Sequence, residues 1–191
     1  SGATAPYRYQ LVGSGPLSPA NTFTGLPAAT HNFHIEDTNK CYLDTAITLT
    51  QPSRIDGNIS VTDVLCFGDT TGSINIQGNG GVPPYTYALG AGAYNTATIF
   101  TPLTSGTYTM HIKDMNNCIR DTAITITEPT ELKFDSVMVT KLKCYGVPGG
   151  EVILKGIGGV SPYMYAINTS VFSTSRIFNG LSAITYNFYV R

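Results

Sequence analysis

The strongest constraint on the fold is an internal repeat with a period of about 78 residues. The motif Pro-Tyr-x-Tyr occurs at residues 6–9, 84–87 and 162–165, so its first tyrosines are 78 residues apart in both steps. The block Asp-Thr-Ala-Ile-Thr occurs at 44–48 and again at 121–125. A period of this length is too long for a solenoid repeat and suits one small domain per repeat.

The repeat divides the chain of 191 residues into three parts. Residues 53–129 form one complete repeat, which ends at Pro129 just as the part before it ends at Pro52. Residues 1–52 match the back of a repeat, and residues 130–191 match the front of one. We therefore expect one complete domain between two partial ones, within an excerpt of a longer tandem array.

Alternation of apolar and polar residues inside each repeat predicts β-strands. In the run 106–113, for example, Tyr108, Met110 and Ile112 alternate with polar side chains, as in a strand with one buried face. Clusters of Gly, Asn, Asp and Ser, which favour turns, separate such runs. The pattern predicts an all-β fold built of tandem immunoglobulin-like antiparallel β-sandwich repeats. In the complete repeat we expect strands near 58–65, 73–78, 84–89, 97–101, 106–113 and 121–127, with a variable region at 93–97.

The segment from Leu103 to Tyr108 predicts a tyrosine corner. In immunoglobulin-like domains such a corner leads into a strand, and a tyrosine hydroxyl ties back to the backbone. Tyr108 and Tyr186 align with His31. The alternative is that any aromatic ring or imidazole simply plugs this position.

The order of motifs in the chain resembles the SprB-type repeat. In the complete repeat the order is C-x-G, G-x-I, G-G-x-x-P-Y-x-Y, F-x-x-L-x-x-G-x-Y, D-x-x-x-C and I-T-I-T-x-P, from Cys66 to Pro129. Repeats of this type occur in large surface adhesins of gliding bacteria of the Bacteroidetes. The resemblance implies a secreted, repetitive cell-surface adhesin, and it implies no enzyme.

Composition and charge exclude several classes of function. A net charge of −1 without a basic patch argues against a nucleic-acid partner. No apolar run approaches the roughly 20 residues of a membrane helix, so we expect no membrane insertion. Motifs of serine hydrolases, zinc proteases and phosphate-binding loops are missing from the sequence. His34 and His111 lie on the polar face of a predicted strand, and we expect no catalytic residues.

Four cysteines suggest disulfide bonds in a surface protein: Cys41, Cys66, Cys118 and Cys144. The expected strand order places Cys66 and Cys118 at opposite ends of one sandwich, too far apart for the roughly 7 Å that a disulfide allows between Cα atoms. We therefore predict disulfides across repeat junctions, in which Cys66 pairs with a cysteine of the following repeat. Free, half-buried thiols are the alternative, and no metal site is expected.

Tyrosines and oxygen-rich turns are the candidate binding sites. Tyr85 and Tyr87 share one face of a predicted strand, where they would form a sugar-stacking ladder if outward and core if inward. Tyr94, in a predicted loop, is the third candidate ligand-binding residue. The turns at 36–39 and 114–117 could bind calcium, although hydrogen bonding within Asx turns accounts for the same residues. We expect no other cofactor.

The resemblance also implies a modification. Surface proteins of that bacterial lineage can carry O-linked glycans at Asp-Ser/Thr-apolar triplets. Matching triplets make four residues candidate O-glycosylation sites: Thr45, Thr122, Thr70 and Ser136.

Together these features favour a stiff, multivalent stalk of an extracellular cell-surface adhesin or filament, used for surface attachment or gliding. Proline limits the hinge in the linkers at 51–53 and 128–130, and many copies multiply weak contacts. The expected partners are neighbouring repeats of the same chain, and surface polysaccharide or other chains in a filament. Two alternatives are a carbohydrate-binding module, which requires outward tyrosines, and an accessory domain of a secreted hydrolase.

Overall fold

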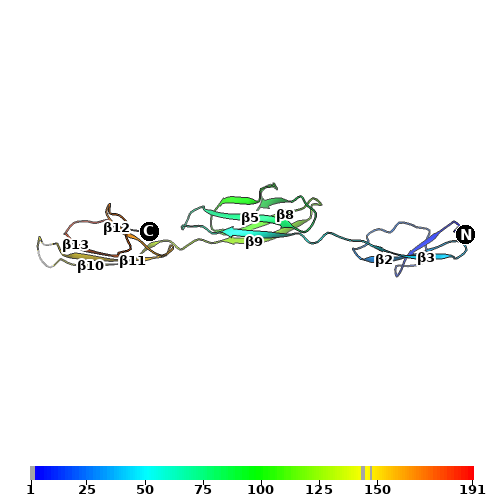
Figure 1. Cartoon of the computed structure of the whole chain (residues 1–191), viewed down its shortest axis with the longest axis horizontal. Coiled ribbons are helices and arrows are strands. Elements are labelled where there is room, and N and C mark those ends of the chain that lie inside the picture. The colour runs from blue at the N-terminus through cyan, green and yellow to red at the C-terminus, as the bar shows by residue number, and fades with distance from the viewer. Residues whose placement is uncertain (1–2, 143–144, 147) are drawn as a thin grey trace. The chain divides into compact units, whose positions relative to one another are not determined.

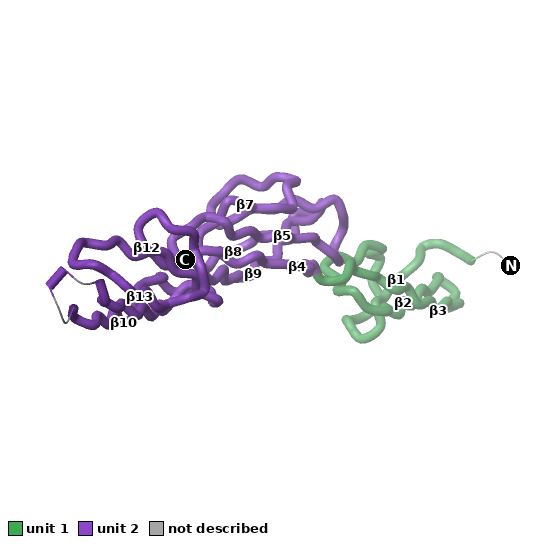
Figure 2. Tube along the Cα trace, turned by 60° about the vertical axis from the view of Figure 1, so that its left-hand side comes forward, with its two compact units in different colours: residues 1–54 green, residues 55–191 purple. Residues whose placement is uncertain are grey.

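The computed structural model describes residues 3–142, 145, 146 and 148–191. Over these residues the chain forms strands and loops without a helix, and the named strands pair antiparallel (Figure 1). Consequently, nothing in this part of the chain is a helix that could cross a membrane. The chain divides into two compact units, residues 1–54 and 55–191 (Figure 2). The predicted all-β sandwich class is confirmed.

The complete repeat consists of two three-stranded sheets. One sheet has the order β4-β5-β7, and the other has the order β6-β8-β9. The strand bounds are β4 (Asp56–Thr62), β5 (Gly72–Asn79), β6 (Thr86–Leu89), β7 (Ile99–Leu103), β8 (Gly106–Lys113) and β9 (Ile119–Ile126). This division of first, second and fourth strands against third, fifth and sixth is the immunoglobulin-like arrangement that the alternation predicts.

The core of this repeat lies between the inner faces of the two sheets. Ile74 and Ile76 of β5 and Met110 of β8 are completely buried, and Ile112 and Ile126 are 1% exposed. Each of these side chains is separated from the next on its strand by one residue, because successive side chains point to opposite faces. The period-two pattern therefore identifies the core of the complete repeat correctly.

Strand ends differ from the expected ranges for local reasons. The first strand ends at Thr62 because the chain then turns to the other sheet, where the Val64 N–H donates to the Thr127 carbonyl at 2.9 Å. The third strand begins at Thr86, two residues after Pro84, which like Pro83 has no N–H to donate. The variable region forms a single bridge, between Tyr87 and Asn95.

Unit 1 contains a single three-stranded sheet in its described residues. Its strands are β1 (Arg8–Leu11), β2 (Thr30–Glu36) and β3 (Tyr42–Thr48), in the order β1-β2-β3. The register pairs Tyr9 with Ile35 and His31 with Ile47, as Tyr87 pairs with Ile112 and Tyr108 with Ile124 in the complete repeat. The sheet of unit 1 is thus the counterpart of β6-β8-β9.

The last part of the chain repeats the first five strands of the complete repeat. The strands are β10 (Lys133–Thr140), β11 (Gly150–Ile157), β12 (Tyr165–Ile167), β13 (Ile177–Leu181) and β14 (Phe188–Val190). They form the sheets β10-β11-β13 and β12-β14, with Val152, Leu154 and Tyr165 buried between them. Each sheet in the described residues draws its strands from one predicted repeat. The predicted boundary near residue 129 stays a prediction, because unit 2 spans it.

The tyrosine corner forms as predicted. The Tyr108 hydroxyl donates to the Thr104 carbonyl at 3.0 Å. The aligned side chains connect to the residue four positions earlier in the other two repeats: His31 Nε2 lies 2.8 Å from the Pro27 carbonyl oxygen, and the Ser182 N–H donates to the Tyr186 hydroxyl at 3.1 Å. An imidazole therefore replaces the phenol with the same backbone connection.

Candidate functional site

The first two candidate ligand-binding residues, Tyr85 and Tyr87, belong to the core. Tyr87 is 5% exposed, and its hydroxyl accepts a hydrogen bond from the Gly78 N–H at 2.9 Å. Tyr85 packs against the same core and donates its hydroxyl to the Gly80 carbonyl. The outward ladder is therefore wrong for these two residues, because their hydroxyls bond to the backbone at the end of β5 and just after it.

This arrangement explains the Pro-Tyr-x-Tyr motif. In the following repeat the Tyr163 hydroxyl donates to the Gly158 carbonyl at 2.7 Å, and the Tyr165 hydroxyl accepts from the Gly156 N–H at 3.0 Å. The motif thus acts as a structural brace in both repeats. The second tyrosine of the motif is 5% exposed in both repeats, and the first is half-buried.

Tyr94 differs because it lies over the outer face of the β6-β8-β9 sheet. Lys113 Nζ is 4.3 Å from the centroid of the Tyr94 ring, a cation–π distance, and the His111 ring centroid is 6.4 Å away. His111 Nδ1 in turn lies 2.6 Å from Asp121 Oδ1 on the neighbouring strand. Tyr94, Lys113, His111 and Asp121, which we call the outer cluster, present an aromatic edge, an ammonium and an imidazole–carboxylate pair.

Parts of the outer cluster recur in the flanking repeats. Arg191 lies over the Phe172 ring, with the guanidinium carbon 4.3 Å from the centroid. His34 Nδ1 lies 2.6 Å from Asp44 Oδ1, and the His34 ring stacks on Tyr42 at 5.3 Å. The imidazole–carboxylate pair thus connects neighbouring strands in two repeats, and the contact of a cation with an aromatic loop residue occurs in two.

The turn after β8 is organised by a buried aspartate. Asp114 is 4% exposed; its Oδ2 accepts from the Val82 N–H at 3.0 Å and its Oδ1 from the Cys118 N–H at 2.9 Å. Both carboxylate oxygens therefore accept hydrogen bonds from backbone N–H groups, one within the turn and one from the loop before β6. Among the described residues no three His, Cys, Asp or Glu side chains gather as metal ligands.

Asp37 holds the equivalent turn of unit 1 in the same way. Its Oδ2 accepts from the Thr4 N–H at 3.1 Å, and its Oδ1 accepts from the Cys41 and Asn39 N–H groups, both at 2.8 Å. These hydrogen bonds hold the pKa of Asp37 below its ordinary value, and the bond from Thr4 has the largest effect. Desolvation of the carboxylate opposes them in part. The charged form of the carboxylate is thus the one that stabilises this turn.

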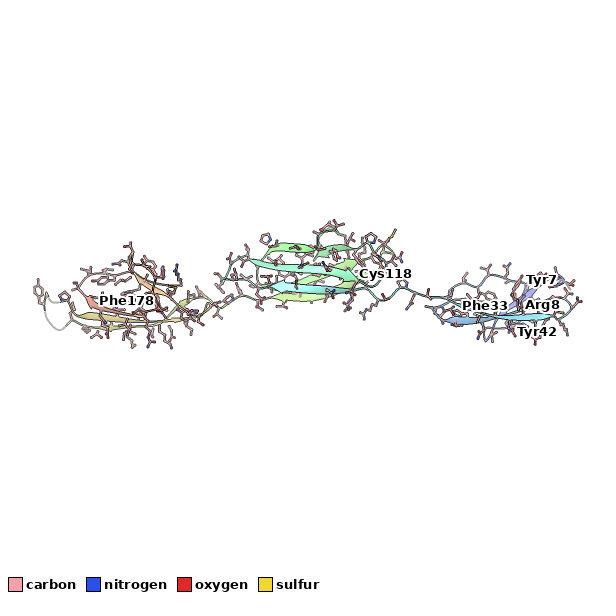
Figure 3. All side chains as sticks on the ribbon, viewed as in Figure 1. Tyr7, Arg8, Phe33, Tyr42, Cys118 and Phe178 are labelled. Atoms are coloured by element: carbon pink, nitrogen blue, oxygen red, sulfur yellow. The ribbon has the colours of Figure 1, made fainter. Side chains whose placement is uncertain are left out.

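Three candidate disulfide residues, Cys41, Cys66 and Cys118, are exposed free thiols, and Cys144 lies outside the described residues. Cys66 follows Val64, which bonds to Thr127 just after β9 ends, whereas Cys118 directly precedes the start of β9 (Figure 3). The eight residues of β9 span about 26 Å at about 3.3 Å per residue. Cys66 and Cys118 therefore lie at opposite ends of the sandwich, as expected, and pairing across junctions stays a prediction.

The candidate glycosylation residues differ in position. Thr45 on β3, Thr70 in the loop before β5 and Ser136 on β10 are exposed, whereas Thr122 on β9 is half-buried. Thr45 and Thr122 occupy the same place in the repeat, and both side chains belong to the inner face of their sheet. The modification itself stays a prediction.

Taken together, the fold and these sites define a repeat-bearing β-sandwich protein in which the recognisable motifs brace loops and turns. Residues 58–93, which include most of β4 and all of β5 and β6, match the family model of the SprB repeat. The resemblance inferred from the sequence is confirmed over this segment. SprB repeats are non-enzymatic repeat domains of cell-surface proteins. A comparison with curated proteins gave no match.

The outer cluster is the feature that sequence reasoning missed. Alternation correctly places His111 and Lys113 on the polar face of their strand. However, the partner Asp121 is brought to His111 by the register of the neighbouring strand, and the partner Tyr94 is brought to Lys113 by the fold of a loop. The available signal was the shared spacing of His34 from Asp44 and of His111 from Asp121.

Proposed function

We propose that this chain is a non-catalytic repeat segment of a large secreted cell-surface adhesin or filament, and that it acts as a stiff, multivalent stalk for surface attachment or gliding. The observation that carries the proposal is the match of residues 58–93 to the SprB repeat. Repeats of the same pattern extend on both sides of this segment, from the first Pro-Tyr-x-Tyr motif to the third. Such tandem copies set a spacing and multiply weak contacts.

The bonding of the polar groups supports a structural role. Every buried side-chain nitrogen or oxygen in the described residues has a hydrogen-bond partner. The two buried carboxylates, Asp37 and Asp114, hold turns and face backbone N–H groups. Groups held in this way are not available for proton transfer to a substrate. The proposed role requires no cofactor, and calcium at these turns would have to displace the backbone donors.

The proposed partners follow from the same reading. The first proposed partners are neighbouring repeats of the same chain. Short linkers that contain Pro52 and Pro129 join the complete repeat to them. Surface polysaccharide or other chains in a filament are the second. The proposed location is extracellular, at the cell surface, without insertion into the membrane and without a nucleic-acid partner.

Solution scattering of the whole chain, together with sedimentation velocity, tests the stalk. We expect a monomer whose largest dimension does not change with ionic strength between 50 mM and 500 mM salt. Steric restriction at a proline linker depends little on charge, whereas attractions between charged surfaces are screened over this range. A particle whose dimensions vary broadly, as for domains on flexible linkers, would contradict a stiff stalk.

The outer cluster favours one second candidate, a carbohydrate-binding module. An aromatic edge beside charged hydrogen-bonding groups is chemistry that sugars use, although Lys113 covers one face of the Tyr94 ring. Glycan-array binding by the chain decides between the two roles. Binding that is lost in Tyr94→Ala but kept in Tyr145→Ala, which removes a fully exposed loop tyrosine, makes the repeat a binding module. An absence of binding in the unaltered chain leaves the stalk role.

A further inference from the structure

The linker that follows the complete repeat is bound on its first side by the loop between β4 and β5. The Thr127 N–H donates to Asp63 Oδ1 at 2.7 Å, and the Thr127 carbonyl accepts from the Val64 N–H at 2.9 Å. One residue further on, Glu128 Oε2 accepts from the Gly68 N–H at 2.6 Å. The complete repeat therefore holds its own exit segment as far as Glu128, beyond the end of β9.

The loop presents the Gly68 N–H from a fixed turn. Gly68 has a φ of +75°, in the left-handed region that favours glycine, and the Asp69 N–H closes the turn onto the Cys66 carbonyl at 3.1 Å. The Leu65 N–H donates to Thr71 Oγ1 at 2.9 Å, which joins the two ends of the loop. The linker carboxylate thus meets a donor whose direction the loop itself sets, so the bond needs little further ordering.

The following repeat binds the other side of the same linker. The Gly159 N–H donates to the Thr130 carbonyl at 2.7 Å. The two backbones approach so closely that a Cβ on Gly158 would collide with the Glu131 carbonyl oxygen. Tyr163 fixes this turn through its hydrogen bond to the Gly158 carbonyl. The turn that the Pro-Tyr-x-Tyr motif braces is therefore also the turn that binds the incoming chain.

The complete repeat receives its own entry segment at the equivalent turn. There a Cβ on Gly81 would lie 2.6 Å from Ile55 Cγ1, and Ile55 is 5% exposed. Leu132 is the equivalent of Ile55, and its Cβ would lie 3.2 Å from a Cβ on Gly159. The close contact recurs with different side chains, so it belongs to the repeat and not to one linker.

Only Pro129 lies between the two bound segments. A peptide chain has two soft torsions per residue, φ and ψ. The pyrrolidine ring fixes φ of Pro129, and it restricts the preceding Glu128 to extended conformations. Both residues are half-buried. The linker thus keeps few free torsions, chiefly ψ of Pro129 and φ of Thr130.

We propose that this linker is a clamped joint, by which we mean that both of its sides are hydrogen-bonded and the two repeats reorient as one body. The loop of residues 65–71 binds the Glu128 carboxylate, and the turn at 158–159 binds the Thr130 carbonyl. Glu128 is the positioning residue, because its side chain ties the linker to the complete repeat. The inference rests on the proposed stalk function, to which the joint gives a mechanism that does not depend on proline alone.

Transfer of magnetic alignment from one repeat to the next tests the joint. A lanthanide tag is attached to Cys118, which precedes β9 and so lies at the end of the sandwich away from this linker, in a chain whose other three cysteines are serines. Residual dipolar couplings in β4–β9 define the alignment tensor, and those in β10–β14 show how much of it reaches the following repeat. We expect the same tensor magnitude in both sets within about 20%, as for one rigid body.

Two glutamates of the same linker give matched variants. Glu128→Ala removes the acceptor of the Gly68 N–H and should reduce the couplings of β10–β14 at least about two-fold relative to those of β4–β9. Glu128→Gln keeps a side-chain oxygen that can accept this bond and should restore most of the transfer. Glu131→Ala removes an exposed side chain of the same type and should leave the transfer unchanged. Amide chemical shifts outside the linker check that each variant stays folded.

Two results overturn the clamped joint. One is an unaltered chain whose β10–β14 couplings average toward zero, and the other is a Glu128→Ala variant that transfers alignment as fully as the unaltered chain. Neither result is confused with a failure of the stalk, because scattering reports on the whole chain, including the linker at Pro52, whereas alignment transfer reports on the linker at Pro129 alone. Full transfer in a particle of broadly varying dimensions would contradict the stalk and support the joint.

Discussion

Replacement of one isoleucine in each of two identical pentapeptides isolates the effect of the facing sheet. Ile124→Ala in the complete repeat and Ile47→Ala in unit 1 remove the same three methyl or methylene groups, from the same block and the same register. The loss of β-propensity is common to both substitutions and cancels in their difference. What differs is the exposed fraction of the side chain, 7% against 49%.

The magnitudes follow from this exposure. Three methylene-sized groups contribute about 2.4 kcal/mol when fully buried, at about 0.8 kcal/mol each. Ile124→Ala loses nearly all of this and leaves a cavity, so we expect a cost of about 3 kcal/mol. Ile47→Ala loses about half and leaves a gap open to water, so we expect about 1 kcal/mol. The difference of about 2 kcal/mol corresponds to about a 30-fold difference in the equilibrium constant for opening.

Native-state hydrogen exchange of the whole chain measures both costs separately. Amides of β8 and β9 report on Ile124→Ala, and amides of β2 and β3 report on Ile47→Ala, each against the unaltered chain. Equal costs, within about 0.5 kcal/mol, would refute the reasoning, because burial by the facing sheet would then not set the stability of this position.

Three further predictions concern the brace, the corner and the aspartate turn. Gly78→Ala places a Cβ about 2.8 Å from Tyr85 Cγ and should lower the free energy of unfolding by about 1–3 kcal/mol in urea titrations, whereas Gly149→Ala, with open space around it, should be neutral. Tyr108→Phe removes the exposed corner hydrogen bond and should cost about 0.5–1 kcal/mol in the same titration. The pKa of Asp37 is lowered in the folded state, so its stabilising contribution is complete above the ordinary value near 4 and is lost as the pH falls through the folded value. The protection of amides around this turn, measured relative to their intrinsic exchange rates, should fall in that acidic range, and Asp37→Asn should remove this pH dependence.

Much of the architecture could be predicted because local pattern and turn chemistry carry it. Alternation identified the strands and their buried faces, as Met110 and Ile112 show, and the corner at Tyr108 followed from its spacing. The candidate binding site was harder to predict. Spacing shows that Tyr85 and Tyr87 share a face, but the pattern of their own strand does not show whether that face is inward.

The sequence by itself determined the repeat, the strand pattern and the resemblance to SprB repeats, because these depend on the order of residues along the chain. The tertiary structure decided which repeated side chains are buried. Identical pentapeptides place Ile47 and Ile124 at the same register, and only the second is covered. The physical reason is that burial of a sheet face depends on a second sheet, and its strands come from segments distant in the sequence.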